Sequence, residues 1–228
     1  MQAILRLALA GALAFLTGAP VWAEQALACE ATDLTVEVPD PDLAARVCAT
    51  AQSGLDLLAE FGLVQSKTIR IQVGSQGALH DTDCMGSFDA GAGLIRLSDP
   101  ATLARSVNPG SLWHRIDAWA LFDSLVIHEL SHALLQQADR ASAPCLADHE
   151  YVAYAAQLSS LAPADRALVL DGSREERIDP AHINDFIVLM DPDLFARAVW
   201  QHFSAPGHGA AFVRGIVAGR LSFYVEPF

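Results

Sequence analysis

The feature that most constrains this chain is residues 114–137, a continuous stretch that contains neither glycine nor proline. Apolar side chains recur through it at helical spacing, which predicts one long helix with a broad buried face. In its middle stand His128-Glu129-Leu130-Ser131-His132, the pattern H-E-x-x-H. Residues four apart share a helix face, so the two imidazoles can reach one metal ion, and Glu129 can take a proton from water bound there.

The H-E-x-x-H pattern is specific in this context. With eight histidines in 228 residues, composition alone gives about 0.01 chance matches to it. The motif also lies inside the predicted helix, directly after the apolar run Leu125-Val126-Ile127. A metal site is therefore favoured over two histidines that merely pack or are solvated.

Two histidines leave a catalytic zinc site incomplete, because such sites take three protein ligands and keep one position for water. Residues 145–157 follow the long helix, are helical by pattern, and are close enough in sequence to fold back against it. Glu150, which comes 18 residues after His132, is the favoured third ligand. The alternatives are Asp148, His149 and Asp139.

The pair of histidines with Glu150 on the next helix resembles the gluzincin branch of the zincin metallopeptidases. The resemblance covers about residues 66–160. It implies a zincin-like fold, with a small sheet before the active-site helix and an edge strand along the substrate cleft, here the hairpin of residues 85–97. It also implies Zn²⁺ held by His128, His132 and Glu150, and hydrolysis of a peptide or protein substrate.

Within this interpretation Glu129 is the general base, which takes a proton from zinc-bound water and passes it to the leaving amine. Tyr154 shares a helix face with Glu150 and is the expected catalytic donor to the oxyanion. Many gluzincins have a carboxylate at the position of Tyr154, which orients a ligand histidine. Other oxyanion donors are Tyr151, His182, His202 and His208. Residues that could orient the ligand imidazoles are Asp123, Asp148 and Asp185.

The order of the remaining segments predicts an α+β fold. Strands are expected at 34–38, 68–73, 85–88 and 93–97, and helices at about 42–61, after Asp99-Pro100, at 146–161 and in pieces after Pro163. The prediction is a zincin-like small mixed sheet with an edge hairpin, the long H-E-x-x-H helix and a helical C-terminal part. One domain would span 24–228, with the sheet and active-site helix at about 66–138 and the ligand helix and helical C-terminal part at about 145–228.

Residues 1–23 are typical of a secretory signal peptide. Arg6 is followed by an apolar run over residues 7–16, and Val21-Trp22-Ala23 ends in a small residue. The apolar run is short for a membrane span, and no later segment approaches the length of one. We therefore expect a periplasmic or secreted protein without stable membrane insertion after cleavage, rather than one with an uncleaved anchor.

Four cysteines lie in the predicted exported part, and an even number in an oxidising compartment predicts two disulfides. Three pairings are possible. We favour Cys29–Cys48, which would tie the mature N-terminus to the first helix, and Cys84–Cys145, which would brace the predicted cleft. Free buried thiols are the alternative.

The net charge of −13 limits the partners. It repels phosphate backbones and anionic lipid, so nucleic acid is not expected as a partner. The favoured function is an exported zinc-dependent hydrolase, most simply a metallopeptidase. The alternative is a non-catalytic zincin-like binding or structural protein of the cell envelope, although such a protein would have no need of Glu129.

Overall fold

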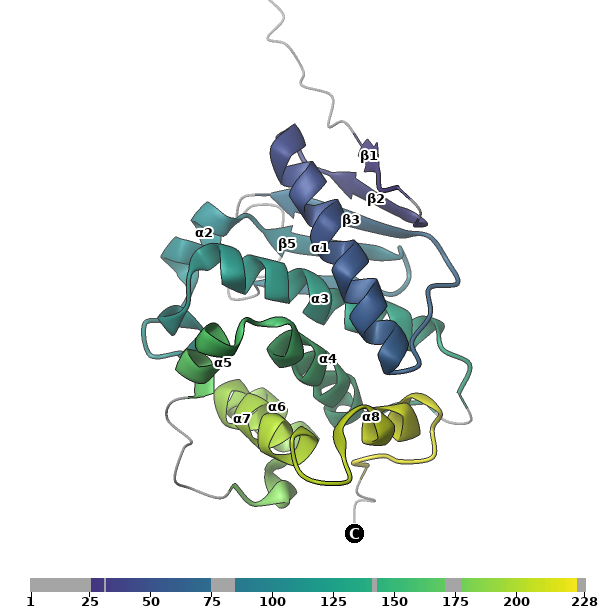
Figure 1. The fold of residues 1–228 in the computed structure, drawn as a ribbon, viewed down its shortest axis with the longest axis vertical. Helices are drawn as coiled ribbons and strands as arrows, with labels where there is room; N and C mark the ends of the chain where they lie inside the picture. The colour runs from purple at the N-terminus through teal and green to yellow at the C-terminus, as the bar shows by residue number, and fades with distance from the viewer. Residues whose placement is uncertain (1–25, 31, 75–84, 141–142, 171–177, 225–228) are drawn as a thin grey trace, which may run out of the picture.

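The computed structural model describes residues 26–30, 32–74, 85–140, 143–170 and 178–224. Strands dominate the first part of this chain and helices the second (Figure 1). In chain order the elements are β1 (Ala26–Ala28), β2 (Leu34–Glu37), α1 (Pro41–Glu60), β3 (Ile69–Gly74), β4 (Gly86–Asp89), β5 (Leu94–Ser98), α2 (Pro100–Ser106), the 3-10 helix η2 (Leu112–Arg115), α3 (Ala118–Gln137), α4 (Leu146–Ser160), α5 (Pro163–Leu170), the 3-10 helix η3 (Pro180–His182), α6 (Asp185–Met190), α7 (Pro192–Phe203) and α8 (Gly209–Val217).

The described strands form one mixed sheet in the order β1-β2-β3-β5-β4. At the centre of the sheet, β3 lies between β2 and β5 and is parallel to both. At the two edges, β1 pairs antiparallel with β2, and β4 pairs antiparallel with β5. The turn between β4 and β5 contains Gly93, whose φ of 59° suits a residue without Cβ. The α+β class, the small mixed sheet and the edge hairpin at residues 85–97 are thus confirmed.

The major helices begin where the sequence supplies an acidic cap. Asp40 accepts a hydrogen bond from the amide of Asp42 at the start of α1, and Pro41 occupies the first helical position. At the start of α3, Asp117 accepts from the amide of Trp119 at 2.8 Å. This cap explains one difference from the sequence prediction, because the helix expected from residue 114 begins only after Asp117.

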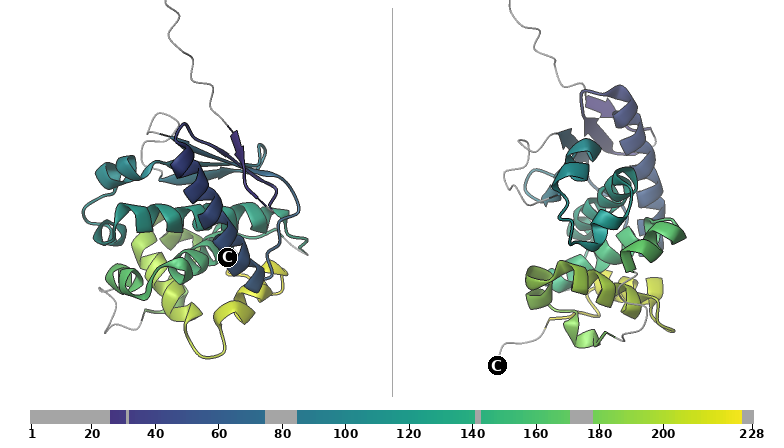
Figure 2. Two further views of the ribbon diagram at one scale, coloured as in Figure 1. Left: turned by 45° about the horizontal axis from the view of Figure 1, so that its top comes forward. Right: turned by 90° about the vertical axis from the view of Figure 1, so that its left-hand side faces the viewer.

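The long helix α3 lies between the sheet and the later helices. It packs on β4 and β5 on one side and on α4 on the other, and α1 crosses it (Figures 1 and 2). Most side chains of α3 are buried, including polar ones in its central turns. Any chemistry carried by this helix is therefore held in a rigid, largely dry setting.

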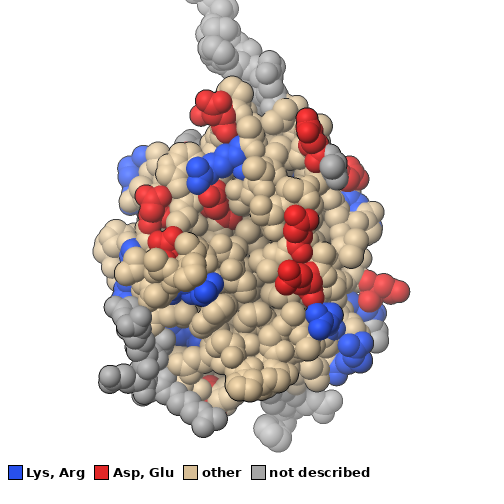
Figure 3. Space-filling view, in the orientation of Figure 1, with Lys and Arg blue, Asp and Glu red and all other residues tan. Residues whose placement is uncertain are grey.

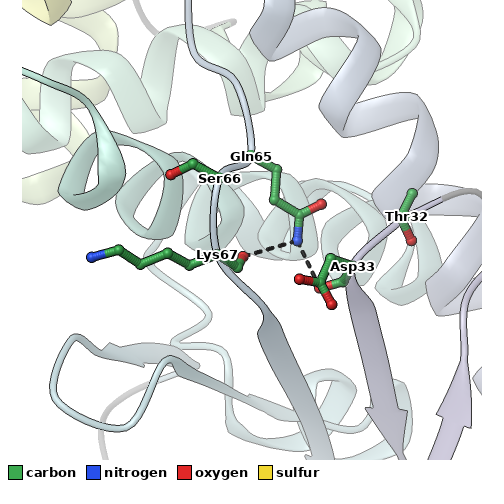
Figure 4. A pocket seen from close by; sticks show the side chains of 5 residues that line it. All are labelled: Thr32, Asp33, Gln65, Ser66 and Lys67. Carbon is green, nitrogen blue, oxygen red and sulfur yellow. Dashed lines mark hydrogen bonds between the residues drawn. The ribbon is translucent and has the colours of Figure 1, made fainter.

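The C-terminal end of α3 is hydrogen-bonded to the segment just before β3. Oε1 of Gln137 accepts the amides of Ser66 and Lys67 at 2.8 and 2.9 Å. Nε2 of Gln65 donates to the carbonyls of Asp33 and Lys67, as the shallow polar pocket in Figure 4 shows. These bonds fix the direction in which α3 runs beneath the sheet.

One predicted disulfide is present. Cys29, just after β1, is bonded to Cys48 on α1, so the bridge ties the N-terminal strand to the first helix as expected. Cys145 has a free thiol in the structure. Its predicted partner Cys84 lies outside the described residues, so the Cys84–Cys145 pairing stays a prediction.

The predicted signal peptide, residues 1–23, also lies outside the described residues. Among those that the structure describes, no helix has both the length and the apolar character that crossing a membrane requires. On the face drawn in Figure 3, the described Lys and Arg side chains lie among Asp and Glu side chains and form no continuous basic surface.

The C-terminal helices and α4 pack around the partly buried side chain of His202. The hydroxyl of Tyr151 on α4 lies 2.8 Å from Nδ1 of His202, and Nδ1 of His208 donates to the carbonyl of His202 at 2.6 Å. The two histidine rings stack with centroids 3.9 Å apart. Burial lowers the pKa of His202 to about 4, and the charge of His208 acts in the same direction.

We predict that this cluster makes the fold sensitive to mild acid. In the unfolded chain His202 takes up a proton near its ordinary pKa of 6.5, whereas in the folded chain it stays neutral down to about pH 4. Between these values the unfolded state binds more protons, so the free energy of unfolding decreases as pH falls. His202→Gln, which can still accept from Tyr151, should weaken this pH dependence in urea-unfolding titrations. The exposed His114→Gln serves as control, and equal pH dependence in the two variants would contradict the prediction.

Candidate metal centre

The predicted ligands converge on one point between α3 and α4. The Nε2 atoms of His128 and His132 are 3.2 Å apart, and each lies 3.5 Å from a different carboxylate oxygen of Glu150. One donor atom from each of the three residues lies within 4.8 Å of the other two. The four-residue spacing on α3 brings the two imidazoles together, and one turn of α4 adds the carboxylate of Glu150.

The sequence explains why α4 presents Glu150 there. Asp148 caps the start of α4, because its carboxylate accepts the amide of Cys145 at 3.2 Å. The same carboxylate accepts the amide of Phe223 and the hydroxyl of Ser222, both at 2.8 Å. Asp148 is thus bound to the C-terminal segment, and Glu150, two residues later, faces α3.

The other candidates for a third ligand are placed differently. Asp139 is exposed in the segment after α3. The ring of His149 lies 5.7 Å from that of His132, centroid to centroid, at the margin of the site. Among the described residues, the group that could hold a metal consists of His128, His132 and Glu150.

A glutamine that sequence reasoning did not single out orients the first histidine. Nδ1 of His128 lies 2.9 Å from Oε1 of Gln157, and Nε2 of Gln157 donates to Oγ of Ser124 at 3.2 Å. Ser124 in turn donates to the carbonyl of Leu121 at 2.8 Å. Because Ser124 donates to a carbonyl, it must accept from the amide NH₂ of Gln157, and Oε1 of Gln157 must therefore accept from His128. His128 thus carries its proton on Nδ1, which leaves the lone pair of Nε2 directed at the site.

The carboxylates proposed for this orienting role have other partners. Asp123 binds Arg46, with the closest pair of atoms 2.6 Å apart, and Asp185 accepts the amide of Ala147 at 2.7 Å. The signal for Gln157 was its spacing, because it lies two helical turns after Glu150 on α4. The sequence predicted a carboxylate in this role, whereas the amide oxygen of Gln157 occupies it.

Burial and mutual charge set the protonation of the cluster. Burial lowers the pKa of His132 to about 3, and the neighbouring His128 adds to the effect. For His128, burial acts to lower the pKa, but the hydrogen bond and charge of Glu150 outweigh it and the net pKa is raised. For Glu150, burial acts to raise the pKa, but the two histidines outweigh it, and the residue stays a carboxylate.

Glu129 is buried beside this group, with 5% of its surface exposed. Burial raises its pKa to about 7, partly offset by His128 and reinforced by the charge of Glu150. A carboxyl group with such a pKa can accept and release a proton near neutral pH.

Tyr154 lies at the site, in contact with His128. Its ring packs edge-on against His128 at a centroid distance of 4.9 Å and stacks on Trp113 at 6.2 Å. Burial raises the pKa of its hydroxyl well above the usual range, so the group stays protonated. Of the other predicted donors, Tyr151, His202 and His208 belong to the C-terminal cluster described above, and His182 lies on η3, which packs against α7.

Residues 34–226 match a family described as "Family of unknown function (DUF6639)". The chain belongs to this family. The match includes α3 and α4, which carry the candidate ligand group, as well as β2 to β5. No curated protein and no solved structure matches the chain.

We predict that Gln157 contributes to metal affinity through His128. Gln157→Leu removes the acceptor for the buried Nδ1–H, and zinc affinity should fall about 10- to 100-fold, as is usual when such a partner is lost. Chelator-competition titrations would measure this fall. Gln157→Glu keeps an acceptor and should retain most of the affinity.

The matched control is Gln52→Leu, the same change at a surface position of α1 where the amide bonds only to Asp56 among the described contacts. If Gln157→Leu folds with the thermal midpoint of that control and binds zinc equally well, His128 does not depend on Gln157.

Proposed function

We propose that this protein is an exported zinc-dependent hydrolase, a metallopeptidase of gluzincin type that acts on peptide or protein substrates. The observation that carries the proposal is the convergence of His128, His132 and Glu150 with Glu129 beside them. Two imidazoles and one carboxylate are the donor set of many catalytic zinc sites, whereas magnesium and calcium prefer oxygen ligands alone. The donor set therefore fits zinc.

The chemistry divides between the ion and the protein. A zinc ion at this site would polarise a substrate carbonyl and lower the pKa of an attacking water toward about 7. Glu129 accepts the proton of that water and passes it to the leaving amine. Gln157 holds His128 in the tautomer that binds metal, and the hydroxyl of Tyr154 is the candidate donor to the developing oxyanion.

The surrounding fold supports a peptide as substrate. β4 is an antiparallel edge strand that packs on the H-E-x-x-H helix, and within the described residues it pairs only with β5. An extended peptide can add to such an edge through main-chain hydrogen bonds. Edge strand, motif helix and a ligand on the next helix together make up the arrangement that the resemblance to gluzincins implies.

Export is part of the same proposal. The predicted signal peptide at residues 1–23 and the Cys29–Cys48 disulfide both suit an oxidising compartment outside the cytoplasm. We therefore propose a periplasmic or secreted location.

The zinc content of variants tests this function. The purified mature protein should hold about one zinc per chain, the number that one three-ligand site implies. Glu129→Gln should keep that zinc and lose about 10²- to 10⁴-fold in peptide hydrolysis, because only proton transfer is removed. His128→Ala should lose both zinc and hydrolysis, while His114→Ala, at an exposed position, should lose neither.

Wild-type protein that stays metal-free at neutral pH in the presence of zinc would refute the proposal. Stoichiometric zinc without cleavage of any member of a broad peptide library would favour the alternative, a non-catalytic zincin-like binding protein.

A further inference from the structure

Strand β4 passes so close to Glu129 that its first residue has no room for a side chain. A Cβ atom built on Gly86 would lie 2.7 Å from Oε1 and 3.1 Å from Cγ of Glu129. It would also lie 2.9 Å from Cδ2 of Leu97, the residue that faces Gly86 across the hairpin. Gly86 is itself buried, so the main chain of β4 forms a wall against the carboxylate of Glu129.

The backbone conformation does not explain the glycine. Gly86 is not among the glycines with positive φ, unlike Gly93 in the turn of the same hairpin. A glycine within a strand costs conformational entropy and gives up side-chain packing, and it commonly marks a close approach of the backbone to something else. Here the backbone of β4 approaches the carboxylate of Glu129.

The helix that carries Glu129 has little freedom to move. It lies on a helix whose neighbouring residues, His128 and Leu130, are also buried. An added methyl group at position 86 would therefore shift the carboxylate of Glu129 and the end of the Leu97 side chain rather than the helix, because the ends of side chains are the parts that can move.

We propose that Gly86 is a positioning residue for the hydrolase, because its missing side chain lets β4 hold the Glu129 carboxylate where it can accept a proton at the metal centre. This inference rests on the proposed function. The variant Gly86→Ala keeps Glu129 and all three candidate ligands, so it changes the position of the Glu129 carboxylate without removing any group of the site. A displacement of about 1 Å at a reacting group can cost about 100-fold in rate.

The test compares Gly86→Ala with Gly91→Ala in the zinc-loaded mature protein. Gly91 lies in the exposed turn of the same hairpin, where a Cβ would meet only Oδ1 of Asp89 at 3.4 Å. Gly86→Ala should keep one zinc per chain, wild-type affinity for zinc in chelator competition and a thermal midpoint close to that of Gly91→Ala. Its kcat on peptides should fall about 100-fold, whereas Gly91→Ala should match the wild type.

Acetohydroxamic acid provides a measurement that needs no substrate. A hydroxamic acid that binds zinc as its anion must give its proton to a nearby base, and Glu129 is the base that the structure offers. Gly86→Ala should therefore weaken acetohydroxamic acid binding about as much as Glu129→Gln does, and Gly91→Ala should leave it unchanged.

A double variant distinguishes positioning from general damage. Glu129→Asp shortens the side chain by one methylene and makes room for a methyl group at position 86. Combined with Gly86→Ala, it should lower kcat by clearly less than the product of the two single effects.

Three results would overturn the role of Gly86 while leaving the proposed function intact: wild-type behaviour of Gly86→Ala, loss of zinc or of thermal stability in that variant, or full additivity with Glu129→Asp. If the wild type itself bound neither zinc nor acetohydroxamic acid, the proposed function would fail, and this inference with it.

Discussion

Burial of ionisable groups in the middle of α3 is the constraint on which the rest of the structure depends. Two histidines and a glutamate lie in a helix packed between a sheet and a second helix layer, where an unpaired charge is costly. Glu150 and Gln157 compensate part of that cost from α4. The Nε2 atoms of His128 and His132 still face each other at 3.2 Å, an arrangement suited to a shared cation.

Hydrogen bonds from several parts of the fold hold α3 and α4 in the positions that bring these buried groups together. Asp117 sets where α3 begins, and Gln137 fixes its other end to the segment just before β3. Asp148 starts α4 and joins it to the C-terminal segment, so that Glu150 is presented to α3. The site is thus supported from the sheet, from α4 and from the C-terminal part.

The convergence of His128, His132 and Glu150 could be predicted from the sequence because it depends on local spacing. His128 and His132 are one helical turn apart, and Glu150 needed only a second helix folded back on the first. The edge hairpin followed in the same way, from two short strand candidates on either side of a turn that contains Gly91 and Gly93. Helical and strand periodicity are properties of short segments, and a single sequence expresses them directly.

The supporting residues could not be predicted, because their roles depend on tertiary distances. Gln157 orients His128 only because α4 packs against α3. Its spacing of two helical turns places it on the same face of α4 as Glu150, but that spacing does not identify His128 as its partner. Gly86 is informative only once β4 is known to pass within contact of Glu129. The late start of α3 depends on Asp117, whose capping role competes with an apolar pattern that runs through it.

X-ray absorption at the zinc K edge of the mature protein would identify the metal ligands themselves. Zinc held by His128, His132 and Glu150 should give a first shell of about four light atoms at about 2.0–2.2 Å, with the outer-shell signature of two imidazoles. Substitution of His132 by alanine should remove one of those imidazole contributions. A sulfur shell at about 2.3 Å, or an oxygen-only shell without imidazole, would contradict this set of ligands.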